Sequence, residues 1–260
     1  MTRPRAYKTE AIVLKRMVQG EADSIFTLYT PNLGKIRVVA RGVRKPKSKL
    51  GGHLEPLTCS ALVLAKGQNL DIITQAQTIE PFLPLRNDLW RTGCSLYAAE
   101  LVDQFCAEQV ENYHIYKLLH STFLWLCEAP AAELVLRTFD LHLLSYLGYR
   151  PEFYQCVNCR AKLEPKRNLF SASGGGVLCP ACGQTDLVAQ PISTDAIKVM
   201  RFLLNQERSS SRRLRMSQEL SWELEQLLRV YIRYLLEREV KSVEFLDRLR
   251  SSSYFLRSTT

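Results

Sequence analysis

The sequence lacks any apolar run of the roughly 18 to 20 residues that a membrane-spanning helix needs. Its first residues, 1–11, contain cations but no apolar stretch after them of the kind found in secretion signals. Strong compositional bias is also lacking, because apolar residues make up 46% and charged residues 23% of the 260 positions, near the average for globular proteins. We therefore expect a soluble, cytoplasmic protein with roughly one to three domains.

Motifs of common catalytic sites are missing. No G-x-S-x-G pattern occurs, and Gly34–Lys35 lacks both the upstream glycine and the following Ser or Thr of a phosphate-binding loop. His114, His120 and His142 lie among apolar neighbours, where a packed histidine is more common than a general base. We therefore expect that the protein is not an enzyme, and we assign no catalytic residue.

Acidic side chains are absent from residues 24–54. Within this stretch, the segment 41–49 holds five cations, and its glycine, proline and serine residues disfavour a helix. Residues 1–80 contain 13 Lys and Arg against 6 Asp and Glu, so this part of the chain is where a polyanion would be attracted. A loop that only improves solubility is the simpler alternative.

Residues 9–80 have a period-2, β-branched pattern broken by turn signals, which predicts five strands. The expected strands cover residues 10–18, 24–30, 35–41, 60–66 and 70–78. This number of short strands favours an OB-fold barrel, a fold that often binds oligonucleotides. In the third strand, alternation places Lys35, Arg37 and Arg41 on the outer face and the residues between them inside.

These features together predict nucleic-acid binding through phosphates by the outer face of the third strand and the basic segment. The expected contacts are Lys35, Arg37, Arg41, Arg44, Lys45, Lys47 and Lys49. A barrel groove can also stack bases on aromatic rings, and Tyr7, Phe26 and Tyr29 are available for this. Phe26 and Tyr29 cannot both face outward from a regular strand, so one of them is expected in the core.

From Pro81 onward, apolar residues recur every three or four positions, which is typical of helices. We expect helices over residues 85–109, 112–128, 131–149, 193–206 and 217–240, packed as one bundle. The basic, serine-rich segment 207–215 between the last two is either a solvated loop or a second phosphate contact.

Two cysteine pairs have the form C-x2-C-x19-C-x2-C. Two such turns place four sulfurs at the corners of a tetrahedron, which suits Zn²⁺. The expected ligands are Cys156, Cys159, Cys179 and Cys182, and a site with four protein ligands is closed and therefore structural. Redox-active or free cysteine pairs are the alternative. The remaining cysteines stand singly and are expected to be buried thiols: Cys59, Cys94, Cys106 and Cys127.

The sequence thus predicts an α+β multidomain chain with an N-terminal five-stranded OB-fold barrel, an all-α helical domain and an inserted four-cysteine zinc module. The expected boundaries are 1–80 for the DNA-binding barrel, 81–153 and 190–250 for the two parts of the helical domain, 154–189 for the zinc module and 251–260 for a C-terminal tail.

Residues 20–56 carry a more specific signature, GEADSIFTLYTPNLGKIRVVARGVRKPKSKLGGHLEP. It contains a Gly-Glu-x-Asp turn, a strand ending in Thr30, Gly34–Lys35 and an Ala-Arg-Gly-x-Arg-Lys-Pro-x-Ser run. With these residues the chain resembles the bacterial recombination-mediator family RecO. The order of barrel, helices, cysteine module and returning helices agrees with that family along nearly the whole chain.

The resemblance implies a cytoplasmic, nucleoid-associated protein that binds single- and double-stranded DNA and anneals complementary strands. It also implies work with RecR to load RecA onto strands covered by single-stranded-DNA-binding protein. Some family members lack the zinc cysteines, whereas this chain keeps all four. Members bind the acidic, apolar C-terminal tail of the single-strand-binding protein in the helical domain, for which Arg137, Arg201 and Arg233 are possible partners.

Two other classes of protein stay open. An RNA-binding or ribosome-associated protein with an OB-fold and a zinc module would have the same charge and cysteines. An interaction scaffold whose barrel binds an acidic protein would have the same basic surface.

Overall fold

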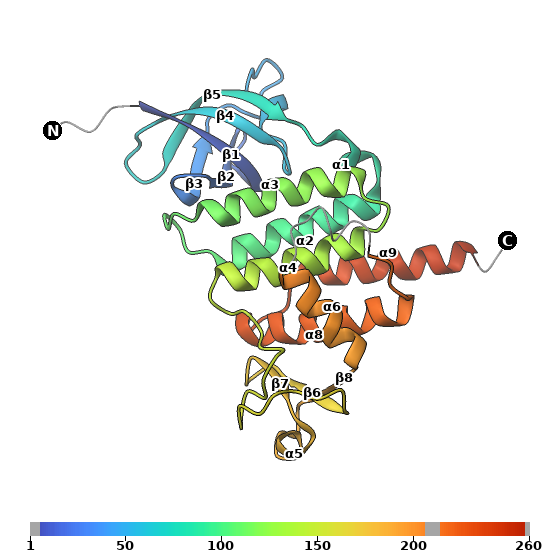
Figure 1. Cartoon of the computed structure of the whole chain (residues 1–260). Coiled ribbons are helices and arrows are strands. Elements are labelled where there is room, and N and C mark those ends of the chain that lie inside the picture. The colour runs from blue at the N-terminus through green and yellow to red at the C-terminus, as the bar shows by residue number, and fades with distance from the viewer. Residues whose placement is uncertain (1–5, 206–213, 258–260) are drawn as a thin grey trace. The chain divides into compact units, whose positions relative to one another are not determined.

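The computed structural model describes residues 6–205 and 214–257. The described residues form two compact units, one made of residues 6–128 and 240–257 and the other of residues 129–205 and 214–239. The N-terminal half of the first unit is the barrel, and the cysteine module lies in the second unit (Figure 1). Across the described ranges, no helix combines the length and apolar character needed to cross a membrane.

The first unit begins with the expected five-stranded barrel, which confirms the predicted fold class. Its strands are β1 (Ala6–Gln19), β2 (Asp23–Thr30), β3 (Gly34–Ala40), β4 (Cys59–Ala65) and β5 (Asp71–Glu80). They close in the order β1-β2-β3-β5-β4. All neighbours are antiparallel except β3 and β5, which pair in parallel over two residues.

Apolar side chains from all five strands fill the barrel, and the predicted alternation of β3 is confirmed. Ile36, Val38 and Ala40 point inward and are at most 7% exposed. Val43 and Leu54, from the connection between β3 and β4, pack into the same core. The connection also contains a short 3₁₀ helix, η1 (Gly51–His53).

Four helices complete the first unit: α1 (Leu83–Asn87), α2 (Leu89–Phe105), α3 (Tyr113–Glu128) and α9 (Lys241–Arg257). Helix α9 packs closely on α2, where a Cβ on Gly93 would lie 2.8 Å from Leu246. The Glu100 carboxylate of α2 accepts the backbone N–H groups of Lys241 and Ser242 at 2.9 and 2.8 Å. It thereby satisfies amides that a helix N-terminus leaves unpaired.

The position of α9 differs from the expected single bundle. The helices divide between two units, and α9, which follows the cysteine module, packs on α2 in the first unit. The segment expected as a tail from residue 251 continues α9 as far as Arg257. The other predicted domain boundaries stay a prediction.

The second unit combines three long helices with the cysteine module. The helices are α4 (Ala132–Tyr146), α6 (Thr194–Asn205) and α8 (Gln218–Leu236). A buried ion-pair network joins α4 to α8, since Arg137 contacts Asp140 at 3.2 Å and Glu225 at 3.3 Å. Most of the segment 207–215 lies outside the described residues, so neither interpretation of it is tested.

The cysteine module has a three-stranded sheet in the order β7-β6-β8. Its elements are β6 (Asn168–Ser171), β7 (Gly176–Leu178), α5 (Pro180–Gly183) and β8 (Gln190–Ile192). Among the single cysteines, Cys59, Cys94 and Cys106 are buried as expected, and Cys127 is half-buried.

Candidate nucleic-acid interface and metal centre

The basic segment 41–49, called the basic loop below, is fixed to the barrel. The backbone N–H of Gly42 donates to the Asp23 carboxylate at 2.7 Å, and that of Arg44 donates to the Ala22 carbonyl at 2.9 Å. Val43 between them is 3% exposed. These contacts fold the loop as a series of turns against the β1–β2 hairpin and leave its cations exposed: Arg41, Arg44, Lys45, Lys47 and Lys49.

The two cations within β3 lie in different surroundings from those of the basic loop. The Lys35 ammonium donates to the Asp103 backbone carbonyl at 2.5 Å and lies 3.2 Å from its carboxylate. Only 12% of the Lys35 side chain is exposed, so this lysine reaches a ligand only if the ion pair opens. Arg37 is 43% exposed and lies at 4.0 Å from Glu108, a separation at which solvent weakens the attraction.

The connection between α2 and α3 covers part of the outer face of β3. The Gln109 N–H donates to the Lys35 carbonyl at 2.8 Å. Gly34 has a φ of +61°, and a Cβ there would lie 1.9 Å from the Val110 carbonyl oxygen. Glycine is therefore required at the start of β3 because the two backbones approach so closely.

Two of the aromatic residues expected to stack bases are inaccessible. Phe26 and Tyr29 are both 0% exposed, so the prediction that one of them lies in the core is confirmed for Phe26, but Tyr29 is not available to a base either. Phe26 belongs to the barrel core, and the Tyr29 hydroxyl lies 3.5 Å from the Asn112 carbonyl just before α3. The helical part of the unit covers the outer face of β2, which sequence alternation cannot reveal.

Tyr7 is half-buried and held in place by charged neighbours. Its hydroxyl donates to the Asp71 carboxylate at 2.6 Å, and the Lys66 ammonium lies 4.6 Å from its ring centroid. Burial alone would raise the pKa of Asp71, but hydrogen bonds from Lys66, Tyr7 and the Gly67 N–H outweigh it and lower the pKa.

Two exposed apolar residues beside the basic loop were missed by sequence reasoning. Met17 and Val18, near the tip of the β1–β2 hairpin, are 48% and 58% exposed. The Arg44 guanidinium donates to the Gly20 carbonyl at this tip, at 3.2 Å. Strand alternation predicts that only one of two neighbours faces out. Here both do, because the hairpin extends beyond the barrel core.

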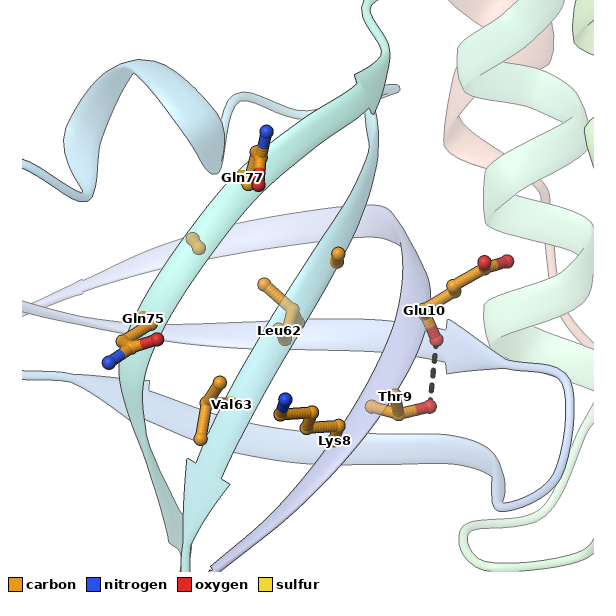
Figure 2. A pocket seen from close by; sticks show the side chains of 9 residues that line it. Lys8, Thr9, Glu10, Leu62, Val63, Gln75 and Gln77 are labelled. Carbon is orange, nitrogen blue, oxygen red and sulfur yellow. Dashed lines mark hydrogen bonds between the residues drawn. The ribbon is translucent and has the colours of Figure 1, made fainter.

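A shallow hollow of about 470 Å³ lies elsewhere on the barrel, across β1, β4 and β5 (Figure 2). Its lining includes Ala61 and Val63 on β4 and the longer Gln75 and Gln77 on β5. Its rim includes Lys8 on one side and Glu10 close by. This mixture of charges does not extend the cationic surface of the basic loop.

The four paired cysteines come together as predicted. Their sulfurs all lie within 4.8 Å of one another, and the Sγ atoms of Cys159 and Cys179 are 3.8 Å apart. A tetrahedral ion with bonds of about 2.3 Å places its sulfurs roughly 3.8 Å apart. The cluster could therefore hold a metal ion.

The two cysteine turns share one backbone hydrogen bond but differ in conformation. The Arg160 N–H donates to the Cys156 carbonyl, and the Gly183 N–H donates to the Cys179 carbonyl, both at 2.9 Å. Arg160 has a φ of +63°, an unusual conformation for a residue other than glycine.

Backbone amides favour the thiolate form of Cys156. Burial alone would raise the pKa of Cys156, but N–H groups of Cys179, Cys159 and Asn158 outweigh it and lower the pKa to about 6. The Cys179 N–H lies 3.4 Å from this sulfur. A hydrogen bond with the neighbouring Cys179 thiol raises the pKa of Cys182 to about 12. Thiolates are the form that binds metals, so Cys156 is prepared for ligation.

The three arginines considered for binding an acidic tail differ in accessibility. Arg137 is 3% exposed and belongs to the buried network of the second unit. Arg201 donates to the Phe153 carbonyl and stacks on Tyr154. Arg233 is 58% exposed and pairs with Glu239 at 3.3 Å.

Comparisons with known proteins agree over nearly the whole chain. Residues 1–82 match the family model "Recombination protein O N terminal", and residues 86–244 match "Recombination protein O C terminal". A protein of Roseiflexus sp. (strain RS-1), named "DNA repair protein RecO", is 46% identical over 248 residues, which cover 95% of this chain and 87% of the relative. The protein of that name from Dehalococcoides mccartyi (strain CBDB1) is 42% identical over 250 residues, covering 96% of this chain and 98% of the relative.

Proposed function

Because the chain belongs to the RecO family of DNA repair proteins, we propose that it is a DNA-binding recombination mediator. In this role it anneals complementary single strands and, with RecR, helps load RecA onto single-stranded DNA covered by single-strand-binding protein. It would act on chromosomal DNA in the cytoplasm. The observation that carries the proposal is the row of five exposed cations on a loop fixed to a closed barrel.

The basic loop suits a protein that must bind any sequence. Its lysines and arginines contact phosphates, which are the same at every nucleotide. Met17 and Val18 beside it offer apolar surface to unstacked bases. Annealing itself needs no catalytic group, because neutralising the phosphates of two strands lowers their mutual repulsion. Double-stranded DNA would bind through the same phosphate contacts.

The cysteine cluster is proposed to hold a structural Zn²⁺. Cys156, Cys159, Cys179 and Cys182 supply a soft, four-thiolate ligand set that favours zinc. A bound ion would cross-link the two cysteine turns and stabilise the short sheet of the module.

RecR and the tail of the single-strand-binding protein are proposed protein partners, and RecA an indirect one. Of the three arginines considered for the acidic tail, Arg233 is the most accessible. The buried Arg137 instead stabilises the packing of α4 against α8.

A strand-annealing assay tests the proposal. Complementary oligonucleotides, one coated with its cognate single-strand-binding protein, are mixed with the wild-type chain or with a variant in which Arg44, Lys45, Lys47 and Lys49 are replaced by Ala. We expect the wild-type chain to accelerate annealing and the variant to bind DNA at least about tenfold more weakly.

A charge-matched control distinguishes an effect of the basic loop from an effect of the lower net charge of the protein. The control variant replaces four exposed lysines that are scattered over the surface, Lys8, Lys15, Lys117 and Lys166. It removes the same charge but should leave annealing nearly intact. Equal loss in both variants would contradict a specific role of the loop. Preference for structured RNA over single-stranded DNA in competition would instead favour the RNA-binding alternative.

A further inference from the structure

The second unit exposes aromatic side chains where α4 gives way to the cysteine module. Tyr146, the last residue of α4, is 42% exposed, and Tyr154 is 43% exposed. Gly148, with a φ of +85°, ends the helix, and the Tyr149 N–H donates back to the Leu144 carbonyl at 2.8 Å. The chain then runs toward the module with Tyr154 at the surface.

Contacts with α6 hold Tyr154 in a fixed position. Arg201 donates from Nε and Nη2 to the Phe153 carbonyl at 3.0 and 2.5 Å, and its guanidinium lies 4.6 Å from the centroid of the Tyr154 ring. The Asn205 amide donates to the Tyr154 hydroxyl at 2.5 Å. Arg150 donates to the same Asn205 side chain at 3.2 Å. Arginine, asparagine and tyrosine side chains thus form a continuous surface row.

Tyr146 is linked to the same helix through His142. Its ring centroid is 6.2 Å from that of His142, and the His142 Nε2 atom is 3.1 Å from the Leu203 carbonyl of α6. Lys198 precedes Arg201 by three positions on α6, which places the two on one helix face, and it is exposed. We name this region the tyrosine–arginine surface: Tyr146, Arg150, Tyr154, Lys198, Arg201 and Asn205.

Two carboxylates near this surface are already engaged: Asp195 pairs with Lys198 at 3.0 Å, and Glu152 is held by backbone amides. Glu152 accepts the backbone N–H groups of Tyr154 at 2.6 Å and Gln155 at 3.2 Å. Its negative charge is therefore engaged by local amides. Fixed aromatic rings between cations are the combination that single-stranded nucleic acids bind, because bases stack on the rings while phosphates contact the cations.

We propose that the tyrosine–arginine surface binds a second single strand of nucleic acid. The inference rests on the annealing function proposed above, which requires two strands to be held at once. One strand contacts the basic loop of the first unit, and the complementary strand contacts this surface of the second unit. Arg201 already covers Tyr154 on one side, so a base stacks from the solvent side and pays little entropy to order the ring.

Binding and crosslinking of an oligothymidylate 20-mer containing 5-iododeoxyuridine test the inference with the full-length protein. In the basic-loop variant, residual binding should weaken about tenfold further when Tyr146→Ala and Tyr154→Ala are added. Photocrosslinks to the iodinated base should map to Tyr146 and Tyr154. The matched control replaces Tyr113 and Tyr234, both 52% exposed, and should bind like its parent.

A second variant guards against a folding defect in the tyrosine variants. Arg150→Glu changes an exposed side chain that contacts Asn205 at the surface, and it should also weaken residual binding with an unchanged circular dichroism spectrum. If both variants keep the oligothymidylate affinity of the basic-loop variant and the crosslinks map elsewhere, the inference is overturned. The proposed function still stands in that case, provided that the wild-type protein binds DNA. Absence of any wild-type binding overturns both. The inference is also overturned if the variants lose binding of an acidic peptide with an apolar C-terminus while their DNA affinity is unchanged, because the surface is then a peptide site.

Discussion

At the scale of single residues, polar partners decide which charged groups are available for binding and which stabilise the fold. Lys35 and Arg44 are both cations of the predicted interface, yet Lys35 is held by Asp103 whereas the Arg44 side chain stays exposed. Asp71 illustrates the stabilising role, since Lys66, Tyr7 and Gly67 all donate hydrogen bonds to its carboxylate.

The lowered pKa of Asp71 predicts a pH-dependent contribution to stability. A carboxylate whose pKa is lower in the folded than in the unfolded chain stabilises the fold above its unfolded pKa of about 3.9. This contribution is lost as the pH falls through the folded value. We expect Asp71→Asn to lower the free energy of unfolding by about 1 to 2 kcal/mol at pH 7.

Denaturant unfolding of the Asp71 variant between pH 7 and 3 is the measurement. The difference from wild type should shrink below about pH 4. Asp195→Asn, which removes an exposed carboxylate, should leave stability nearly unchanged. A constant difference for Asp71→Asn over the whole range would argue against the ionised carboxylate as the cause.

The close approach of the α2–α3 connection to Gly34 predicts that no larger residue fits at the start of β3. Gly34→Ala would bring a Cβ against the Val110 carbonyl oxygen in addition to the strain of a φ of +61°. Gly20 is a matched control, because its φ is +58° but nothing lies within 4 Å of its Cβ position. We expect Gly20→Ala to cost about 1 kcal/mol of unfolding free energy and Gly34→Ala at least about 2 kcal/mol more. Equal costs in denaturant titrations would show that the connection moves away freely.

At the scale of elements, the cysteine module has short strands and a cluster of four cysteines that could hold a metal ion. Its three strands contain three or four residues each, and the two cysteine turns join through the sulfur cluster. Helix α9 is held instead by close packing at Gly93 and by the Glu100 carboxylate.

Cys156→Ser is expected to abolish stoichiometric metal binding and to loosen the module selectively. Elemental analysis should find about one zinc ion per wild-type chain. Hydrogen exchange should increase in residues 151–192 of the variant while the barrel stays protected, because the barrel has its own core. Cys127→Ser changes a half-buried single cysteine and should retain the metal. Full protection of the metal-free module would contradict a structural role.

At the scale of the whole molecule, charge is unevenly distributed along a chain of net charge +9. Five of the 13 cations of residues 1–80 lie within the basic loop, which is exposed and fixed to the barrel. Affinity for single-stranded DNA should therefore fall with salt, with a log–log slope of about 0.7 per phosphate neutralised.

The salt dependence also measures how many loop cations contact phosphates. Replacing Arg44, Lys45, Lys47 and Lys49 by Ala should reduce the magnitude of the slope by up to about 3, as measured by fluorescence anisotropy across a salt titration. The scattered four-lysine control should change it much less. An unchanged slope in the loop variant would place the phosphate contacts elsewhere.

Local sequence determined the elements with strong patterns. Five period-2 segments predicted the barrel strands, and alternation within β3 placed Ile36, Val38 and Ala40 inside. The spacing of the cysteine pairs predicted their convergence, because four thiols in two tight turns favour one tetrahedral geometry. Strand alternation and cysteine spacing are patterns of neighbouring residues, so they can be recognised in a single sequence.

Tertiary packing decided what local patterns cannot encode. The partner that holds Lys35, the helical cover that buries Tyr29 and the return of α9 to α2 all come from residues distant along the chain. Period-2 alternation tells which face of a strand a side chain occupies, but not whether another element covers that face. The availability of a cation or an aromatic ring for binding is therefore fixed by long-range contacts, whose energies depend on geometry that only the folded chain provides.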